Sequence, residues 1–258
     1  REKDVLLGPG VNIYRTPYNG RNFEYMGEDP FLAGEMCVPY IKEVQKNGVA
    51  VCLKHYCLNN QECNRHIADV KVSDRALYEI YLPAFKAGVE KGGAWSVMAA
   101  YNLYKGQHLC HNKYLLDDVL KGEWAFDGAV ISDWGGAHDP DQAAAYGLDL
   151  EYGTWTDGLS TKGKKSYDSY MLADPYLERL RDGRASLETL DDKAGRVLKL
   201  IFRTAMKTDK PFGSLNSPEH HAAARAIGAD GIVLLKNDAP AQGVKVLPVE
   251  LESTKKIL

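Results

Sequence analysis

Short apolar runs recur along the chain, and each is bounded by turn residues. They span residues 4–7, 49–53, 95–100, 129–131 and 147–151. An uninterrupted apolar run between turn signals is typical of a strand buried on both faces. Between the runs, apolar side chains recur at helical spacing, so the order is strand, helix, strand, helix. This alternation predicts an α/β fold with a parallel sheet and right-handed crossovers.

Capping residues mark where several of the helices begin and end. Asp29 and Pro30 start a helix that ends at Asn47-Gly48, and Ser73 caps the next, which Pro83 should kink. Asn112 caps another. Further helices are expected over residues 139–146, 176–184, 187–206 and 220–227, a polar loop over 154–169, and a strand over 231–236.

The predicted strands are too few for the barrel architecture that the pattern indicates. Five strands do not close a barrel, so residues 1–206 are interpreted as a (β/α)8 TIM-type barrel that lacks about three N-terminal strands. Residues 207–217 resemble a linker, and residues 218–258 hold too few elements for a domain. We therefore expect the chain to be cut at both ends.

Composition narrows the classes of partner. The formal net charge is −3 and no long basic patch occurs, which argues against nucleic acid and anionic membranes. No apolar run approaches the roughly 20 residues that span a bilayer. Five cysteines without paired metal-ligand spacing predict free thiols, no metal and no cofactor, and favour a reducing, cytoplasmic compartment. A homo-oligomer is compatible with the sequence.

Polar and aromatic side chains gather where the predicted strands end, which is the catalytic face of a barrel. Asp133 stands between an apolar run and two glycines, beside Trp134. Glycoside hydrolysis needs two carboxyl groups, and Asp133 is the candidate nucleophile. The acid is open among Glu62, Asp149 and Glu151. The alternatives are that Asp133 only caps a loop and that Lys54 forms a Schiff base. The other candidates at the strand ends are Arg21, His55, Met98, Tyr101 and Asn102.

Eight ordered motifs resemble glycoside hydrolase family 3. They include Gly-Arg-Asn-Phe-Glu at 20–24, Lys-His-Tyr at 54–56, Asn-Gln-Glu at 60–62 with Arg65, and Met-x-x-Tyr-Asn at 98–102. Val-Ile-Ser-Asp-Trp-Gly at 130–135 is similar to that family's nucleophile motif, and residues 147–151 and 233–237 also match. The resemblance spans residues 4 to about 250.

The resemblance implies a retaining β-glucosidase that releases terminal non-reducing β-D-glucosyl residues. By this analogy Asp133 is the nucleophile, Arg21, Lys54 and His55 hold sugar hydroxyls in the −1 subsite, and Met98, Tyr101 and Trp134 line that subsite. Asp149 and Glu151 become structural, and the acid/base Glu belongs to an α/β sandwich domain that begins near residue 218. The expected partner is a β-glucoside or oligosaccharide.

Three other readings stay open. One is a β-xylosidase or another exo-β-glycosidase of the same family. A second is a Schiff-base lyase on the same barrel, acting through Lys54. A third is an incomplete, non-catalytic glycan-binding fragment, because the implied acid/base lies outside this chain.

Overall fold

The computed structural model describes residues 3–153, 170–239, 243, 245–249 and 252 of the chain. The chain divides into two compact units, residues 1–211 and 212–258, which are described separately. The loop predicted over 154–169 lies outside the described residues.

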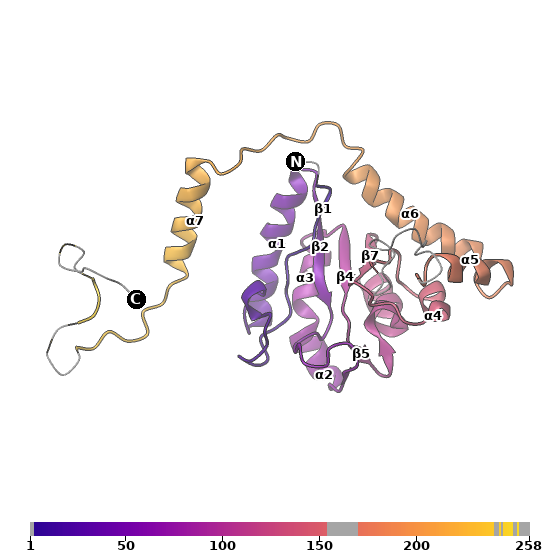
Figure 1. The fold of residues 1–258 in the computed structure, drawn as a ribbon, viewed down its shortest axis with the longest axis horizontal. Coiled ribbons are helices and arrows are strands. Elements are labelled where there is room, and N and C mark those ends of the chain that lie inside the picture. The colour runs from indigo at the N-terminus through magenta and orange to yellow at the C-terminus, as the bar shows by residue number, and fades with distance from the viewer. Residues whose placement is uncertain (1–2, 154–169, 240–242, 244, 250–251, 253–258) are drawn as a thin grey trace, which may run out of the picture. The chain divides into compact units, whose positions relative to one another are not determined.

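A four-stranded parallel sheet forms the centre of the first unit. Its strands are β1 (Val5–Leu6), β2 (Ala50–Tyr56), β4 (Ser96–Ala99) and β7 (Ala129–Ser132), and they lie in the order β1-β2-β4-β7 (Figure 1). Each strand joins its neighbour in parallel register. The order of strands along the sheet follows their order in the sequence, so each connection leads to the neighbouring strand.

The α/β class is confirmed, whereas the described residues form an open sheet and not a closed barrel. Closure needs about eight tilted strands with a matching stagger, and four strands cannot supply it. The fifth predicted strand, residues 147–151, is reduced to a single parallel bridge between Leu150 and Ile131. This bridge still places the end of that segment beside the end of β7.

Helices cover the sheet between successive strands (Figure 1). Asp29 caps α1 by accepting hydrogen bonds from the N–H groups of Phe31 and Leu32, as predicted. Pro83 interrupts the second helical stretch, also as predicted. The bounds are α1 (Pro30–Lys46), α2 (Asp74–Ala76), η2 (Leu77–Tyr81), α3 (Pro83–Glu90), η4 (Tyr114–Glu123), α4 (Pro140–Ala145), α5 (Asp174–Arg181) and α6 (Leu187–Arg203), with short 3-10 turns η1 (Asn22–Glu24) and η3 (Leu109–His111).

Alternation along the strands divides the buried side chains between the two faces of the sheet. Val51, Leu53, Val97, Ala99 and Val130 belong to the larger cluster, together with apolar side chains of α1 and α3. The other face carries a smaller cluster that includes Ala50, Cys52, Met98, Ala129 and Ile131. By the same alternation, Asp133 continues the face of Ala129 and Ile131 beyond the end of β7.

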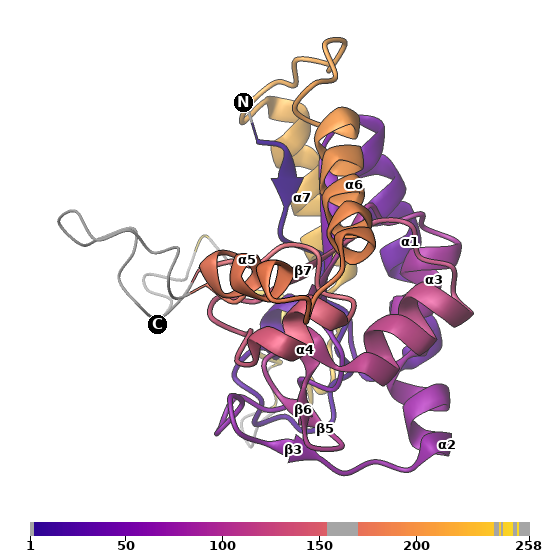
Figure 2. The same cartoon turned by 90° about the vertical axis from the view of Figure 1, so that its right-hand side faces the viewer.

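A second sheet was not predicted from the sequence. It consists of β3 (Asp69–Val70), β5 (Leu103–Tyr104) and β6 (Gln107–His108), which lie together in Figure 2. Strands of two residues are too short to show alternation, so no sequence pattern marks them. They fix the segments that follow β2 and β4, and these segments contribute several side chains to the candidate site.

The second unit contains α7 (Pro218–Asp230), which includes the helix predicted over 220–227. The strand predicted over 231–236 is wrong, since these residues form no strand and are mostly exposed. A strand needs a neighbouring backbone to hydrogen-bond with, and the described residues of this unit contain none. None of the described helices is long and apolar enough to cross a membrane.

Candidate active site

The carboxyl ends of three parallel strands bring the candidate residues together. Lys54 and His55 lie at the end of β2, Tyr101 follows β4, and Asp133 follows β7. Because neighbouring parallel strands end at the same edge of a sheet, side chains from distant parts of the chain meet there.

The buried carboxylate of Asp133 has its two oxygens in different environments. Oδ1 accepts a hydrogen bond from the backbone N–H of Trp134 at 2.8 Å. Oδ2 lies 3.7 Å from Nε2 of His55 and, within the described part of the chain, makes no hydrogen bond of normal length and angle. One oxygen therefore holds the side chain in place, while the other keeps its lone pairs for a reacting atom.

A bulge in β2 allows two consecutive side chains to serve the site. The register of β2 against β4 shifts between Leu53 and Tyr56. Lys54 and His55 therefore oppose a single residue, Met98, as in a β-bulge. On an ideal strand the two side chains would point to opposite faces, and a bulge changes that direction.

His55 is held at both its backbone and its ring. The Asn12 amide donates to the His55 carbonyl at 3.0 Å and accepts from the His55 N–H at 2.8 Å. The hydroxyl of Tyr25 lies 3.2 Å from Nδ1. When that hydroxyl donates to Nδ1, the ring proton is on Nε2 and points towards Asp133. The imidazole then offers a fixed donor beside the carboxylate.

Glu24 links the two cations of the site. It accepts a hydrogen bond from Nε of Arg21, and its Oε2 lies 2.8 Å from Nζ of Lys54. Burial alone would raise the pKa of Glu24, but the bonds from Arg21 and Lys54 outweigh it and lower the pKa. Burial lowers the pKa of His55 well below its ordinary value, and the nearby cations Arg21, Lys54 and Arg65 lower it further. The imidazole is therefore neutral at neutral pH.

Tyr101 is buried between two side chains of the loop after β2. The Arg65 guanidinium lies 4.5 Å from its ring centroid, and the His66 ring packs edge-on at 4.3 Å. Arg65 also pairs with Glu62 at 2.8 Å. Burial raises the pKa of Tyr101, and the Asp133 carboxyl beside it raises the pKa further, so the phenol keeps its proton.

Trp134 and Met98 occupy different surroundings. Trp134 is 48% exposed, and its ring lies 5.3 Å from that of Tyr152. A Cβ on Gly153 would approach the Trp134 ring to 2.6 Å, so a glycine is needed to admit the indole. Met98 is fully buried in the smaller apolar cluster. The indole is therefore accessible to a ligand, whereas Met98 supports the sheet face beneath the site.

Two further acids are already paired. Asp149 lies 2.7 Å from Nζ of Lys121 and accepts a 2.7 Å hydrogen bond from the N–H of Val130. Glu62 is paired with Arg65. Glu151 differs, because it accepts a 2.8 Å hydrogen bond from the N–H of Leu172 and its other oxygen is buried. Burial raises the pKa of Glu151 to about 7, although backbone hydrogen bonds oppose the shift.

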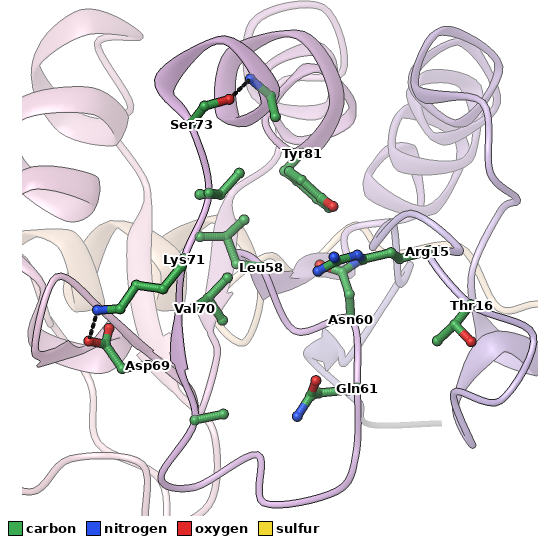
Figure 3. A pocket seen from close by; sticks show the side chains of 13 residues that line it. Arg15, Thr16, Leu58, Asn60, Gln61, Asp69, Val70, Lys71, Ser73 and Tyr81 are labelled. Carbon is green, nitrogen blue, oxygen red and sulfur yellow. Dashed lines mark hydrogen bonds and ion pairs between the residues drawn. The ribbon is translucent and has the colours of Figure 1, made fainter.

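A cavity of about 690 Å³ lies outside this constellation. Figure 3 shows Arg15, Tyr81 and Asn60 around it, with Lys71 paired to Asp69 at its rim. None of the candidate residues Arg21, Lys54, His55, Tyr101 or Asp133 lines it. Its single acid is neutralised by Lys71, so the cavity lacks the free carboxylate that glycoside chemistry needs.

Histidines gather beyond Tyr101, and their protonation couples stability to pH. Burial lowers the pKa of His138 to about 4, and the neighbouring rings of His108, His111 and His66 lower it further. A histidine whose pKa is lowered in the fold contributes its full stability above the unfolded value near 6.5. That stability is lost as the pH falls from about 6.5 towards 4.

We therefore expect His138→Phe to gain thermal stability relative to the unchanged protein on acidification. The reason is that only an unfolded histidine binds the additional proton. The ring is partly exposed, so the gain should be modest, about 1–3 °C in Tm between pH 7.5 and 4.5. Differential scanning fluorimetry on the protein that contains this chain measures it. A Tm difference that does not change with pH would contradict the expectation.

Residues 3–154, which carry every side chain assigned above to the Asp133 site, match the family model described as Glycosyl hydrolase family 3 N terminal domain. The chain belongs to glycosyl hydrolase family 3. The resemblance inferred from the ordered motifs is thus confirmed.

Relatives within the family carry related activities. Beta-glucosidase BoGH3A of Bacteroides ovatus is 62% identical over 100% of this chain and 34% of its own length. An exo-alpha-(1->6)-L-arabinopyranosidase of Bifidobacterium breve is 40% identical over 91% of this chain and 29% of its own. The structure of beta-glucosidase 3B from Thermotoga neapolitana with alpha-D-glucose superposes with a TM-score of 0.80 at 40% identity, covering 91% of this chain and 32% of that one.

The family member described here thus spans about a third of the length of the curated relatives it matches. The sequence placed Asp133, His55, Lys54, Arg21 and Tyr101 at strand ends, and the structure brings them together. It did not select Glu24 or Arg65, although both stand in motifs that carried the resemblance. An acid three residues after Arg21 in a polar loop was the available signal for Glu24.

Proposed function

We propose that this chain supplies the nucleophile and part of the sugar site of a retaining β-glucosidase. The observation that carries the proposal is the Asp133 carboxylate, with one oxygen bound to a backbone N–H and the other free beside a neutral His55. The names of the relatives support a β-glucoside as the substrate class. The family membership supports glycoside hydrolysis as the reaction class.

In the proposed mechanism, Oδ2 of Asp133 attacks the anomeric carbon while the bond to the leaving oxygen breaks. The leaving oxygen takes a proton from a general acid, and a glucosyl ester of Asp133 forms. Water then attacks the same carbon, the general base accepts a proton from it, and the ester bond breaks. Two inversions give net retention.

The chain's own cations and donors suit the sugar hydroxyls. Lys54 and Arg21 share Glu24, which fixes their direction, and each retains N–H groups for a ligand. His55 presents Nε2, and Arg65 lies over Tyr101. We propose that Arg21, Lys54, His55 and Arg65 bind hydroxyls of the sugar and that Tyr101 and Trp134 line its site.

The general acid is the part of the mechanism that these residues do not provide. Among the described acids near the sheet edge, Glu62 and Asp149 are paired with Arg65 and Lys121. Glu151 joins the backbone at Leu172 to the end of the sheet. We propose that the acid/base belongs to another part of the longer protein, as in the family resemblance.

The Schiff-base alternative for Lys54 is disfavoured by its contacts. A lysine must be unprotonated to attack a carbonyl, and Lys54 forms a 2.8 Å ion pair with Glu24.

The comparisons also support a second candidate, another exo-glycosidase specificity, because one relative is named exo-alpha-(1->6)-L-arabinopyranosidase. Assays on aryl α-L-arabinopyranosides and β-xylosides beside β-glucosides would rank these substrates.

Covalent trapping tests the proposed nucleophile directly. We expect an activated 2-deoxy-2-fluoro-β-glucoside to inactivate the full-length protein, because the fluorine slows hydrolysis of the glucosyl ester more than its formation. Peptide mass spectrometry should then find one 2-fluoroglucosyl group on Asp133. A label on another carboxylate or on Lys54 would overturn the assignment.

A further inference from the structure

Two imidazole rings are stacked beyond Tyr101, outside the group of residues assigned to the attacked sugar. The ring centroids of His108 and His138 are 4.0 Å apart at an interplanar angle of 31°. His138 is exposed and His108 is half-buried, so this stack is accessible from solvent in the described part of the chain. The mechanism proposed above uses neither ring.

A chain of hydrogen bonds through Asp139, Gln142 and His111 supports the backbone at His138. Nε2 of the Gln142 amide donates to Oδ2 of Asp139 at 3.0 Å, which fixes the orientation of the amide. Its oxygen can only accept, so Nδ1 of His111, at 2.9 Å, must donate to it. The Nε2 lone pair of His111 is then free to accept the backbone N–H of His138 at 3.3 Å. Every bond in this chain has a matching donor and acceptor.

The same reasoning fixes the proton on His108. Its Nδ1 lies 3.1 Å from the carbonyl oxygen of Tyr101, and a carbonyl only accepts. Nδ1 therefore carries the proton, and in the neutral ring Nε2 is an acceptor. The stack thus combines a flat face with a hydrogen-bond acceptor in a fixed position.

Tyr101 connects the stack to the reaction centre. Its carbonyl holds His108, and its phenol lies beside Asp133. His66 packs against the Tyr101 ring, and its charge environment includes both Asp133 and His108. The stack and the Asp133 site therefore share Tyr101 and His66 as common neighbours.

A flat aromatic surface with a hydrogen-bond acceptor beside it suits a carbohydrate. Flat rings cover the apolar C–H face of a pyranose, and Nε2 accepts from a hydroxyl. A metal ion is a poorer fit, because no three His, Cys, Asp or Glu side chains among the described residues converge to hold one. The formal net charge of −3 also argues against nucleic acid.

We propose that His108 and His138 form an imidazole platform that binds the leaving-group sugar of an oligosaccharide substrate. The proposal rests on the proposed function of the Asp133 site. According to this proposal, the platform makes the enzyme prefer substrates whose leaving group is a sugar over substrates with a small leaving group. His111, Gln142 and Asp139 act as positioning residues for it.

The test compares two substrates in the full-length protein. A β-linked glucose disaccharide places a sugar on the platform, whereas β-glucosyl fluoride has no leaving-group sugar. We expect His138→Ala to lower the disaccharide-to-fluoride ratio of kcat/KM about tenfold, chiefly through KM. His138→Phe should restore most of that ratio, because it keeps the flat face. His220→Ala, an exposed histidine of α7, is the matched control.

The possible outcomes separate the two proposals. If the unchanged protein hydrolyses the fluoride and Asp133→Gly does not, the proposed function stands. If His138→Ala then leaves the disaccharide-to-fluoride ratio of kcat/KM unchanged, including the case in which both kcat/KM values fall equally, the platform proposal is wrong. If the unchanged protein hydrolyses neither substrate, the proposed function is wrong, and the platform proposal that rests on it is overturned as well.

Discussion

Replacing Asp133 by Gly should lower kcat on an aryl β-glucoside by about 10⁴-fold or more. Removing the nucleophile of a two-step mechanism typically costs this much, because the remaining binding groups cannot form the covalent intermediate. The Asp133 side chain is held by the Trp134 N–H and faces His55. Among the described acids near the sheet edge, Asp149 is paired with Lys121, Glu62 with Arg65, and Glu151 is held by the N–H of Leu172, so we expect none of them to replace Asp133. Steady-state kinetics on the full-length protein measure the loss.

Azide should partly rescue the Asp133→Gly variant. With the carboxylate gone, azide attacks the anomeric carbon from the vacated side and the aryloxide leaves, which gives α-glucosyl azide. The matched control is Asp127→Asn, an exposed acid before the start of β7 that pairs with Lys199. The control should retain activity. Activity of Asp133→Gly within a few-fold of the unchanged protein, or rescue with retained stereochemistry, would exclude Asp133 as the nucleophile.

The strands and helices were predictable where local physics decides them. The runs over 49–53, 95–100 and 129–131 are strands because only a central parallel strand buries both faces of such a run. Asp29 caps α1 because its carboxylate satisfies N–H groups that the first turn leaves unpaired. These features depend on a few neighbouring residues, so the sequence contains them directly.

Features that depend on partners far away in the chain were not predictable. The apolar run over 231–236 is not a strand because pairing, and not apolarity alone, makes one. Closure of a barrel depends on the number and stagger of all strands, and the described sheet has four. The β3-β5-β6 sheet is set by contacts between loops, for which two-residue strands give no pattern.

The site residues divide in the same way, into those that neighbouring residues predict and those that depend on distant partners. Asp133, His55 and Tyr101 were predicted because each follows an apolar run that ends at one edge of a parallel sheet. Glu24 was missed because it lies in an irregular loop, where its role depends on Lys54, thirty residues further along. The His108–His138 stack was missed for the same reason, since the two rings come from different loops.

Replacing Glu24 by Ala should lower kcat/KM on an aryl β-glucoside about 100-fold. Arg21, Lys54 and Glu24 have side chains only 22%, 15% and 19% exposed, so removing the acid leaves two cations partly buried without their shared counter-ion. Breaking such a pair by removing one partner is strongly unfavourable, and the cations then move to other partners or to water. Their positions for sugar hydroxyls are lost with them.

The effect of Glu24 should be separable from a general loss of stability. Glu24→Gln keeps one acceptor oxygen, which can serve Arg21 or Lys54 but not both, and removes the charge, so we expect it to recover only part of the activity. Glu28→Ala, an exposed acid four residues along the same loop, is the matched control and should remain within about twofold. Kinetic measurements with Tm measured in parallel distinguish a positioning role of Glu24 from a purely structural one. A positioning role predicts that the variant loses activity at 25 °C although it is still folded. Full activity of folded Glu24→Ala would show that Arg21 and Lys54 need no such anchor, and that this carboxylate serves only the stability of the loop.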